Sequence, residues 1–172
     1  FFLGTGFNNK VYTSLLQPDG KILVAGSFTQ FNGTAVGRLV RLNSDGSRDS
    51  SFTASPGSTN SIIYNIALQS DGSIFLVGSF TNFNGTTANR IVKILPSGAV
   101  DTSFVVGSGA SGLIEKVALQ PDGKIIIGGG FSSFNGVSVG KIARLNANGT
   151  LDTSFVTGVG FDDNVSAIGV QA

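Results

Sequence analysis

The sequence predicts an all-β protein of tandem four-stranded antiparallel meanders, arranged as β-propeller blades. One observation is a period: short motifs recur 52 and then 51 residues further along the 172-residue chain. A fixed period of about 50 residues is typical of propellers, solenoids and arrays. The other observation is that each period carries two turn sequences, such as Pro-Asp-Gly at 18–20 and Ser-Asp-Gly at 44–46. A meander of four strands needs three connections, and a loop carrying Phe-Asn-Gly at 31–33 supplies the one between these two turns.

Three kinds of position define the register of the repeat. An Asp lies in the first turn, a Phe ends the second expected strand, and a second Asp follows the second turn. These positions are Asp19, Asp71 and Asp122; Phe28, Phe80 and Phe131; and Asp49, Asp101 and Asp152. We therefore treat residues 1–172 as one repeat array, with full periods at approximately 1–51, 52–103 and 104–154 and the start of a fourth at 155–172.

Each period is expected to form strands A to D. The expected ranges are 11–17, 64–69 and 116–120 for A, 21–28, 73–80 and 124–131 for B, and 38–43, 90–95 and 141–146 for C. A short strand D is expected to end at Phe52, Phe104 or Phe155. Strand B is apolar on both faces, which indicates a strand covered from both sides. A β-solenoid-like array is the alternative, although its coils are usually shorter, at about 20–30 residues.

A cation precedes the second Asp by eight residues in every unit. The three pairs are Arg41 with Asp49, Lys93 with Asp101, and Arg144 with Asp152. Because the turn of the C/D hairpin lies between the two residues, we expect a cross-strand ion pair whose Asp also caps backbone donors. The repeated Phe residues are expected to be buried between blades. They are not expected to stack on bases, because a base-stacking platform also needs a basic groove.

The composition excludes much chemistry. The chain has no His and no Cys, which rules out Ser-His and Cys-His nucleophile pairs, a typical zinc site and disulfides. The segment 43–49 resembles a calcium loop, but the second unit lacks most of its oxygen ligands, so we interpret it as a β-turn. The pair Asp162 and Asp163 is interpreted as part of a solvated loop. We expect no enzyme, no catalytic residue, no cofactor and no metal.

Charge and hydropathy restrict the partners. With 11 Lys and Arg against 10 Asp and Glu, the net charge of +1 argues against nucleic-acid binding. No apolar run approaches the 18 residues or more of a membrane-spanning helix, so no membrane insertion is expected. Four Asn residues, at 32, 84, 148 and 164, fit the N-glycosylation pattern, and three of them begin Asn-Gly turns that the fold would use in any case. Glycosylation is left open.

The repeat unit resembles the delta-60 repeat, a tandem β-propeller-type repeat of large bacterial surface and secreted proteins. The resemblance extends over all three periods, and in the third period it rests on residues 118–124, 129–131, 134–136, 143–146 and 149–155. The second unit departs most, with Ser70 in place of Pro and Leu95-Pro96-Ser97 in the second turn. The period is also short for that family. The resemblance implies a propeller-type scaffold in an exported protein and implies no catalytic residue.

These observations predict a non-enzymatic, extracellular or cell-surface repeat scaffold with a structural or adhesive role, within a larger surface protein, secreted protein, fibre or filament. The alternative is a ligand- or carbohydrate-binding propeller module, which would gather exposed aromatic and polar side chains on one rim. Expected partners are neighbouring repeats of the same chain or identical subunits, with a protein or glycan ligand possible. The chain begins with Phe1 and has no Met, and the segment 165–171 repeats strand A without its partner. We therefore expect the array to be completed from outside.

Overall fold

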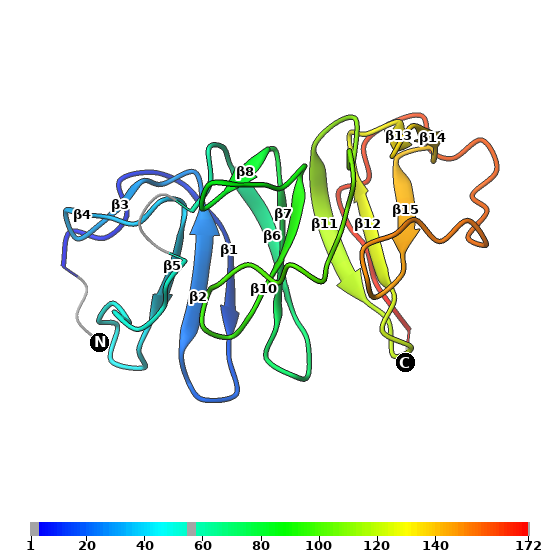
Figure 1. Ribbon diagram of the computed structural model, residues 1–172. Helices are drawn as coiled ribbons and strands as arrows, with labels where there is room; N and C mark the ends of the chain where they lie inside the picture. The colour runs from blue at the N-terminus through cyan, green and yellow to red at the C-terminus, as the bar shows by residue number, and fades with distance from the viewer. Residues whose placement is uncertain (1–3, 55–57, 172) are drawn as a thin grey trace.

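The computed structural model describes residues 4–54 and 58–171, and all regular structure in them is β-strand. The expectations that fall on Phe1 and Ala172 lie outside these residues. Three three-stranded antiparallel sheets stand side by side (Figure 1). Their strands are β1 (Val11–Leu16), β2 (Ile22–Gly26) and β5 (Leu39–Leu42); β6 (Ile63–Leu68), β7 (Ile74–Gly78) and β10 (Ile91–Ile94); and β11 (Ile114–Leu119), β12 (Ile125–Gly129) and β15 (Ile142–Leu145). The predicted all-β, propeller-type class is confirmed. Within the described ranges, no helix could cross a membrane.

A small two-stranded ribbon connects the middle strand of each sheet to the outer strand. The ribbons are β3 (Gln30–Phe31) with β4 (Thr34–Ala35), β8 (Asn82–Phe83) with β9 (Thr86–Thr87), and β13 (Ser133–Phe134) with β14 (Val137–Ser138). Each turns on an Asn-Gly pair, and in the first ribbon Asn32 has φ +47° and Gly33 φ +76°. Two consecutive positive φ angles are the requirement of a type I′ hairpin, which Asn-Gly meets at little cost.

The fourth strand of each unit is shorter than the sequence predicts. It is reduced to single bridges, which join Leu42 to Arg48, Ile94 to Val100, and Leu145 to Leu151. Beyond the bridge, the chain forms hydrogen bonds with the next unit instead of with its own. The Thr53 amide donates to the Ser97 carbonyl at 2.9 Å, and the Val105 amide donates to the Asn148 carbonyl at 2.8 Å. The link between units therefore begins directly after Phe52 and Phe104, where strand D was expected to end.

The core lies between the sheets. On β7, Ile74 and Leu76 pack toward the first unit, in a cluster that includes Leu23 and Leu39. The alternating residues Phe75 and Val77 pack toward the third unit. Strand B is thus covered on both faces, as its apolar run indicated. Phe28, Phe80 and Phe131 are each 0% exposed, so all three occupy the buried environment expected of them.

The C-terminal segment 165–171 is not a strand, which corrects the expectation of a fourth strand A. The Val165 amide donates to the Gly129 carbonyl at 3.4 Å, and no strand pairing follows within the described residues. The segment still passes over β12, because the side chains of Val165 and Ile168 lie where a Cβ on Gly128 would be. In Figure 1, the segment runs beside the third sheet as an inner strand would, but it forms no hydrogen-bond ladder.

Candidate functional site

Each unit contains the expected cation–carboxylate pair. The atoms are Arg41 Nε and Asp49 Oδ2 at 2.8 Å, Lys93 Nζ and Asp101 Oδ2 at 3.1 Å, and Arg144 Nε and Asp152 Oδ2 at 2.7 Å. In each unit the Asp also accepts from the backbone amide two residues later, at 3.0 Å. The first-turn residues Asp19, Asp71 and Asp122 accept from amides in the same way, at 2.8–3.1 Å. These carboxylates therefore hold hairpin turns in place.

The surroundings of Asp49 show why this network is structural. Its Oδ2 accepts from both Lys21 Nζ and Arg41 Nε at 2.8 Å, and its Oδ1 accepts from the Ser51 hydroxyl at 2.6 Å. Arg41 continues to the next unit, where it donates to the Pro96 carbonyl at 2.6 Å. Burial raises the pKa of Asp49, but the hydrogen bonds from Lys21, Ser51 and Arg41 outweigh burial and hold that pKa well below its usual range.

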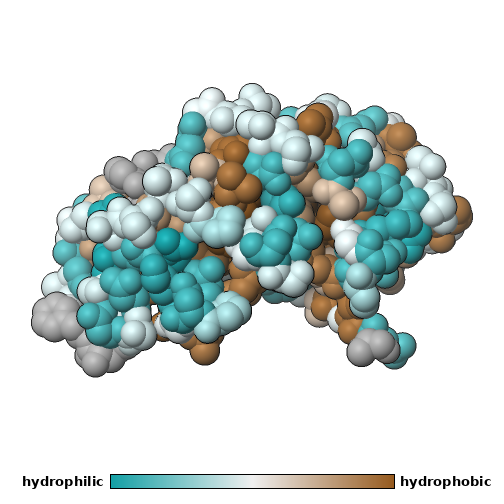
Figure 2. All heavy atoms as spheres, turned by 60° about the horizontal axis from the view of Figure 1, so that its bottom comes forward, coloured by the Kyte–Doolittle hydropathy of each residue, from teal (hydrophilic) through white to brown (hydrophobic). Residues whose placement is uncertain are grey.

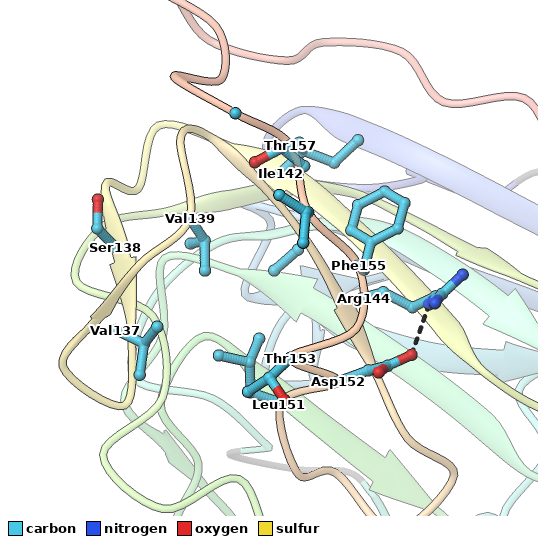
Figure 3. A pocket seen from close by; sticks show the side chains of 13 residues that line it. Val137, Ser138, Val139, Ile142, Arg144, Leu151, Asp152, Thr153, Phe155 and Thr157 are labelled. Carbon is cyan, nitrogen blue, oxygen red and sulfur yellow. Dashed lines mark hydrogen bonds and ion pairs between the residues drawn. The ribbon is translucent and has the colours of Figure 1, made fainter.

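Two kinds of cavity recur with the repeat. One lies at the outer rim of the third unit, beside Ile142, Leu151 and Phe155 and next to the Arg144–Asp152 pair (Figure 3). Its counterpart in the second unit is lined by residues in the same register, including Ile91 and Phe104. Because equivalent framework residues line both cavities, we assign them to the packing of the repeat.

The second kind of cavity lies between neighbouring A/B turns, at the lower end of the sheets in Figure 1. Figure 2 turns this end toward the viewer and shows mainly polar residues with smaller apolar patches among them. Each of these clefts is bordered by Gln residues that end strand A. The side-chain oxygens of Gln17, Gln69 and Gln120 are buried and have no partner among the described residues. This Gln is the same in every unit, which again points to the framework.

A fifth cavity differs from the others, because its residues change from unit to unit. It has a volume of about 380 Å³, lies at the inner strands, and is lined by Tyr12, Tyr64, Glu115, Lys116 and Ser166. Tyr12, Tyr64, Glu115 and Ser166 occupy one register position in successive units, separated by 52, 51 and 51 residues. The chain contains only two Tyr and one Glu, and all three line this inner-strand cavity.

A β-bulge in each inner strand exposes this position. Val11 pairs with Gly26 and Thr13 with Ala25, so Tyr12 between them has no partner on β2. The same shift occurs at Tyr64 in β6 and at Glu115 in β11. A bulge leaves its extra residue outside the ladder and re-aims its side chain. β6 contacts both β1 and β11, so the three bulges are brought together at the inner edge of the array.

A glycine on the middle strand, opposite each bulge, leaves room for the backbone of the bulged strand. A Cβ at Gly26, Gly78 or Gly129 would overlap the carbonyl oxygen of Lys10, Ile62 or Leu113, respectively. Each of these oxygens accepts a hydrogen bond from the amide that follows the glycine, at 2.9–3.0 Å. The backbone of the bulge is therefore specified by a residue common to all units. The cavity is not among the sites predicted from the sequence, although the repeated glycine and the changing residue opposite it are both visible in the sequence.

The inner-strand cavity combines aromatic and polar groups. The Tyr12 and Tyr64 rings meet edge to face, with centroids 5.3 Å apart and planes at 80°. Tyr12 is 45% exposed, and Glu115 and Lys116 are half-buried. Asn164 Nδ2 donates to Glu115 Oε1 at 3.2 Å, which orients the carboxylate. One carboxylate and one ammonium balance the charge. Among the described residues, no three His, Cys, Asp or Glu side chains come together as metal ligands.

No curated protein matches the sequence. A matching solved structure, a protein of unknown function from Bacteroides caccae at 1.35 Å resolution, shares 13% identity with a TM-score of 0.40. That match covers 83% of this chain and 65% of the other chain.

The family described as "Domain of unknown function (DUF5122) beta-propeller" matches residues 17–52, 69–104 and 120–155, which together exceed half of the chain. Each matched segment begins at the Gln that follows an inner strand, so the bulge positions 12, 64 and 115 lie outside all three. The chain is a member of the DUF5122 beta-propeller family of tandem repeats.

Proposed function

We propose that the chain is a non-enzymatic structural or adhesive scaffold within an extracellular or cell-surface bacterial protein, fibre or filament. The proposal rests on one observation: the residues that recur in every unit serve the packing and the turns of the fold. The apolar core, with its repeated Phe residues, packs successive units together. The cation–carboxylate pairs and the Asn-Gly ribbons recur in register and hold the hairpins of each unit. A propeller is built by placing such units next to one another around an axis, so each unit offers the same framework to its neighbour.

A second observation supports neighbouring repeats as partners. Phe7, Thr59 and Ala110 occupy one register position, and each forms a bridge to a ribbon Phe, namely Phe31, Phe83 and Phe134, respectively. Phe161 occupies the same position after the third unit and is 55% exposed in the described chain. Val156 and Val159 beside it are 84% and 101% exposed. These apolar side chains suit the ribbon of a further unit of the same kind, from the same chain or an identical subunit.

Multi-angle light scattering over a range of concentrations tests the association. We expect the 172-residue chain to self-associate, and Phe161→Ser to weaken that association without lowering the melting temperature. A concentration-independent monomer would contradict the role of Phe161 in association. For localisation, antibody labelling and protease treatment of intact producing cells should reach this segment. Protection in intact cells, together with cleavage after lysis, would contradict an extracellular scaffold.

A second candidate function, a ligand-binding propeller module, is favoured by one specific observation. The inner-strand cavity gathers an aromatic pair, the exposed Tyr12 and the half-buried Tyr64, and several polar groups on one surface. Such a gathering is the feature by which a binding module differs from a purely structural array.

A further inference from the structure

We propose that the inner-strand cavity binds a neutral saccharide, through stacking on Tyr12 and Tyr64 and hydrogen bonds to Glu115, Lys116 and Ser166. The proposal rests on the second candidate function and gives that function a ligand class. It begins from the way the cavity is built: the same bulge recurs in the three inner strands and presents Tyr12, Tyr64 and Glu115 in turn. Ser166 holds the same register position in the C-terminal segment, which is not a strand, and lines the same cavity.

The neighbouring positions show that this variation is local. Before the bulge residue, the inner strands and the C-terminal segment carry Val11, Ile63, Ile114 and Val165, and at the far end each has Gln, at 17, 69, 120 and 171. Both kinds of residue keep their chemistry in every unit. The register position of Tyr12, Tyr64, Glu115 and Ser166 carries aromatic, acidic and hydroxyl groups instead. A position that packing does not constrain, but that lines a shared cavity, can be used for recognition.

The aromatic pair determines the shape of the ligand. The edge-to-face arrangement of Tyr12 and Tyr64 forms a corner that presents ring surface and phenol hydroxyls together. A sugar ring has the complementary character, because one face consists of C–H groups and the rim carries hydroxyl groups. The volume of about 380 Å³ is within the range of small-molecule sites, which is roughly 300–1,000 Å³.

The charges determine the ligand class. Glu115 supplies a carboxylate that accepts hydrogen bonds from hydroxyl groups, and Lys116 supplies an ammonium that donates them. An aromatic corner by itself would also suit a quaternary ammonium ion. Lys116 in the same cavity repels such a cation, and Glu115 likewise repels an anion. A neutral ligand with many hydroxyl groups avoids both repulsions and uses both charged groups.

The chain offers a selective way to observe binding. It contains no Trp, and its two Tyr residues both line the cavity, so tyrosine fluorescence reports on this site alone. Cellobiose, maltose, lactose and chitobiose would be titrated separately into the 172-residue chain. We expect at least one of them to change the fluorescence with saturation, and calorimetry on the same pair to give the same dissociation constant.

Variants identify the residues. Glu115→Gln removes a charged acceptor and Tyr64→Ala removes a stacking face, and each should weaken binding at least about tenfold, as measured by calorimetry. Leu16→Ala is the matched control, because Leu16 lies on an inner strand, is 69% exposed and does not line the cavity. Its affinity should equal that of the unchanged chain. Melting curves of all three variants would separate loss of binding from loss of folding.

Two results would overturn the inference, and they have different consequences. A response to glycine betaine or inorganic phosphate, with none to the four sugars, would refute the saccharide class and leave ligand binding in place. No response to any of these probes, by fluorescence or calorimetry, would refute the ligand-binding function as well. Sugar binding that survives both Glu115→Gln and Tyr64→Ala would place the saccharide elsewhere. None of these outcomes affects the scaffold function, whose readout is association.

Discussion

Removal of the Asp49 carboxylate should destabilise the chain more than its single charge suggests. Asp49→Ala deletes the acceptor shared by Lys21 and Arg41, and both cations remain in place. The Arg41 side chain is only 9% exposed, so water cannot readily replace the lost partner, whereas Lys21, at 30%, is partly solvated. Loss of one partner from a buried ion pair costs about 3–5 kcal/mol. Because Arg41 keeps its bond to Pro96, we expect the low end.

We therefore expect a loss of about 3 kcal/mol in the free energy of unfolding, which lowers the melting temperature by roughly 6–12 °C in a domain of this size. Urea unfolding followed by circular dichroism measures the first quantity, and a thermal scan the second. Asp45→Ala is the control, since Asp45 accepts only from Ser47 in an exposed turn. Adding Arg41→Met to Asp49→Ala should restore part of the loss, because an apolar side chain needs no counter-charge. If Asp49→Ala proves as stable as Asp45→Ala, the buried-cation argument is wrong.

Three other predictions concern the framework. Phe80→Ala should lower the unfolding free energy by about 3–5 kcal/mol in urea titrations, since Phe80 is 0% exposed, whereas the 55% exposed Phe161 should tolerate alanine with little change. Stability should fall as the pH drops below about 4. The pKa of Asp49 is lowered in the folded chain, so at low pH the unfolded chain binds more protons at this residue than the folded chain does. Urea unfolding at about pH 7 and pH 3 measures the loss of unfolding free energy, which should be smaller for Asp49→Ala than for the unchanged chain. Gly78→Ala should disturb the β6 bulge, because its Cβ would overlap the Ile62 carbonyl, and near-ultraviolet circular dichroism of the tyrosines should change.

Much of the fold could be predicted from the sequence because turns and apolar runs act locally. The Asn-Gly pairs fix ribbons through two positive φ angles, and this local requirement is the same wherever the unit occurs. The spacing of eight residues between Arg41 and Asp49 likewise follows from the geometry of one hairpin. Each of these features depends on a few neighbouring residues, so the repeat reveals it three times.

Features that depend on contacts with another unit could not be predicted from such local patterns. Strand D was expected to end at Phe52 but is reduced to the single bridge between Leu42 and Arg48. Directly after the expected end, Thr53 donates to Ser97 of the next unit. The segment 165–171 has the sequence of an inner strand, yet a strand also requires a partner with free donors and acceptors. In the described chain, the one backbone hydrogen bond of this segment runs from the Val165 amide to the Gly129 carbonyl. The sequence therefore shows that this segment corresponds to an inner strand. Its conformation differs from a strand because no described neighbour pairs with it along its length.

The candidate site was missed for a related reason. A repeat is recognised by the residues that its units share, whereas this cavity is lined by residues that differ from unit to unit. The invariant Gly26, Gly78 and Gly129 open a bulge in every inner strand, and the ladder continues on either side of it. The bulge side chain therefore carries little of the packing between sheets. The unit can exchange Tyr for Glu at this position while its core remains intact, and this separation of framework from cavity allows one repeat to combine scaffold and recognition.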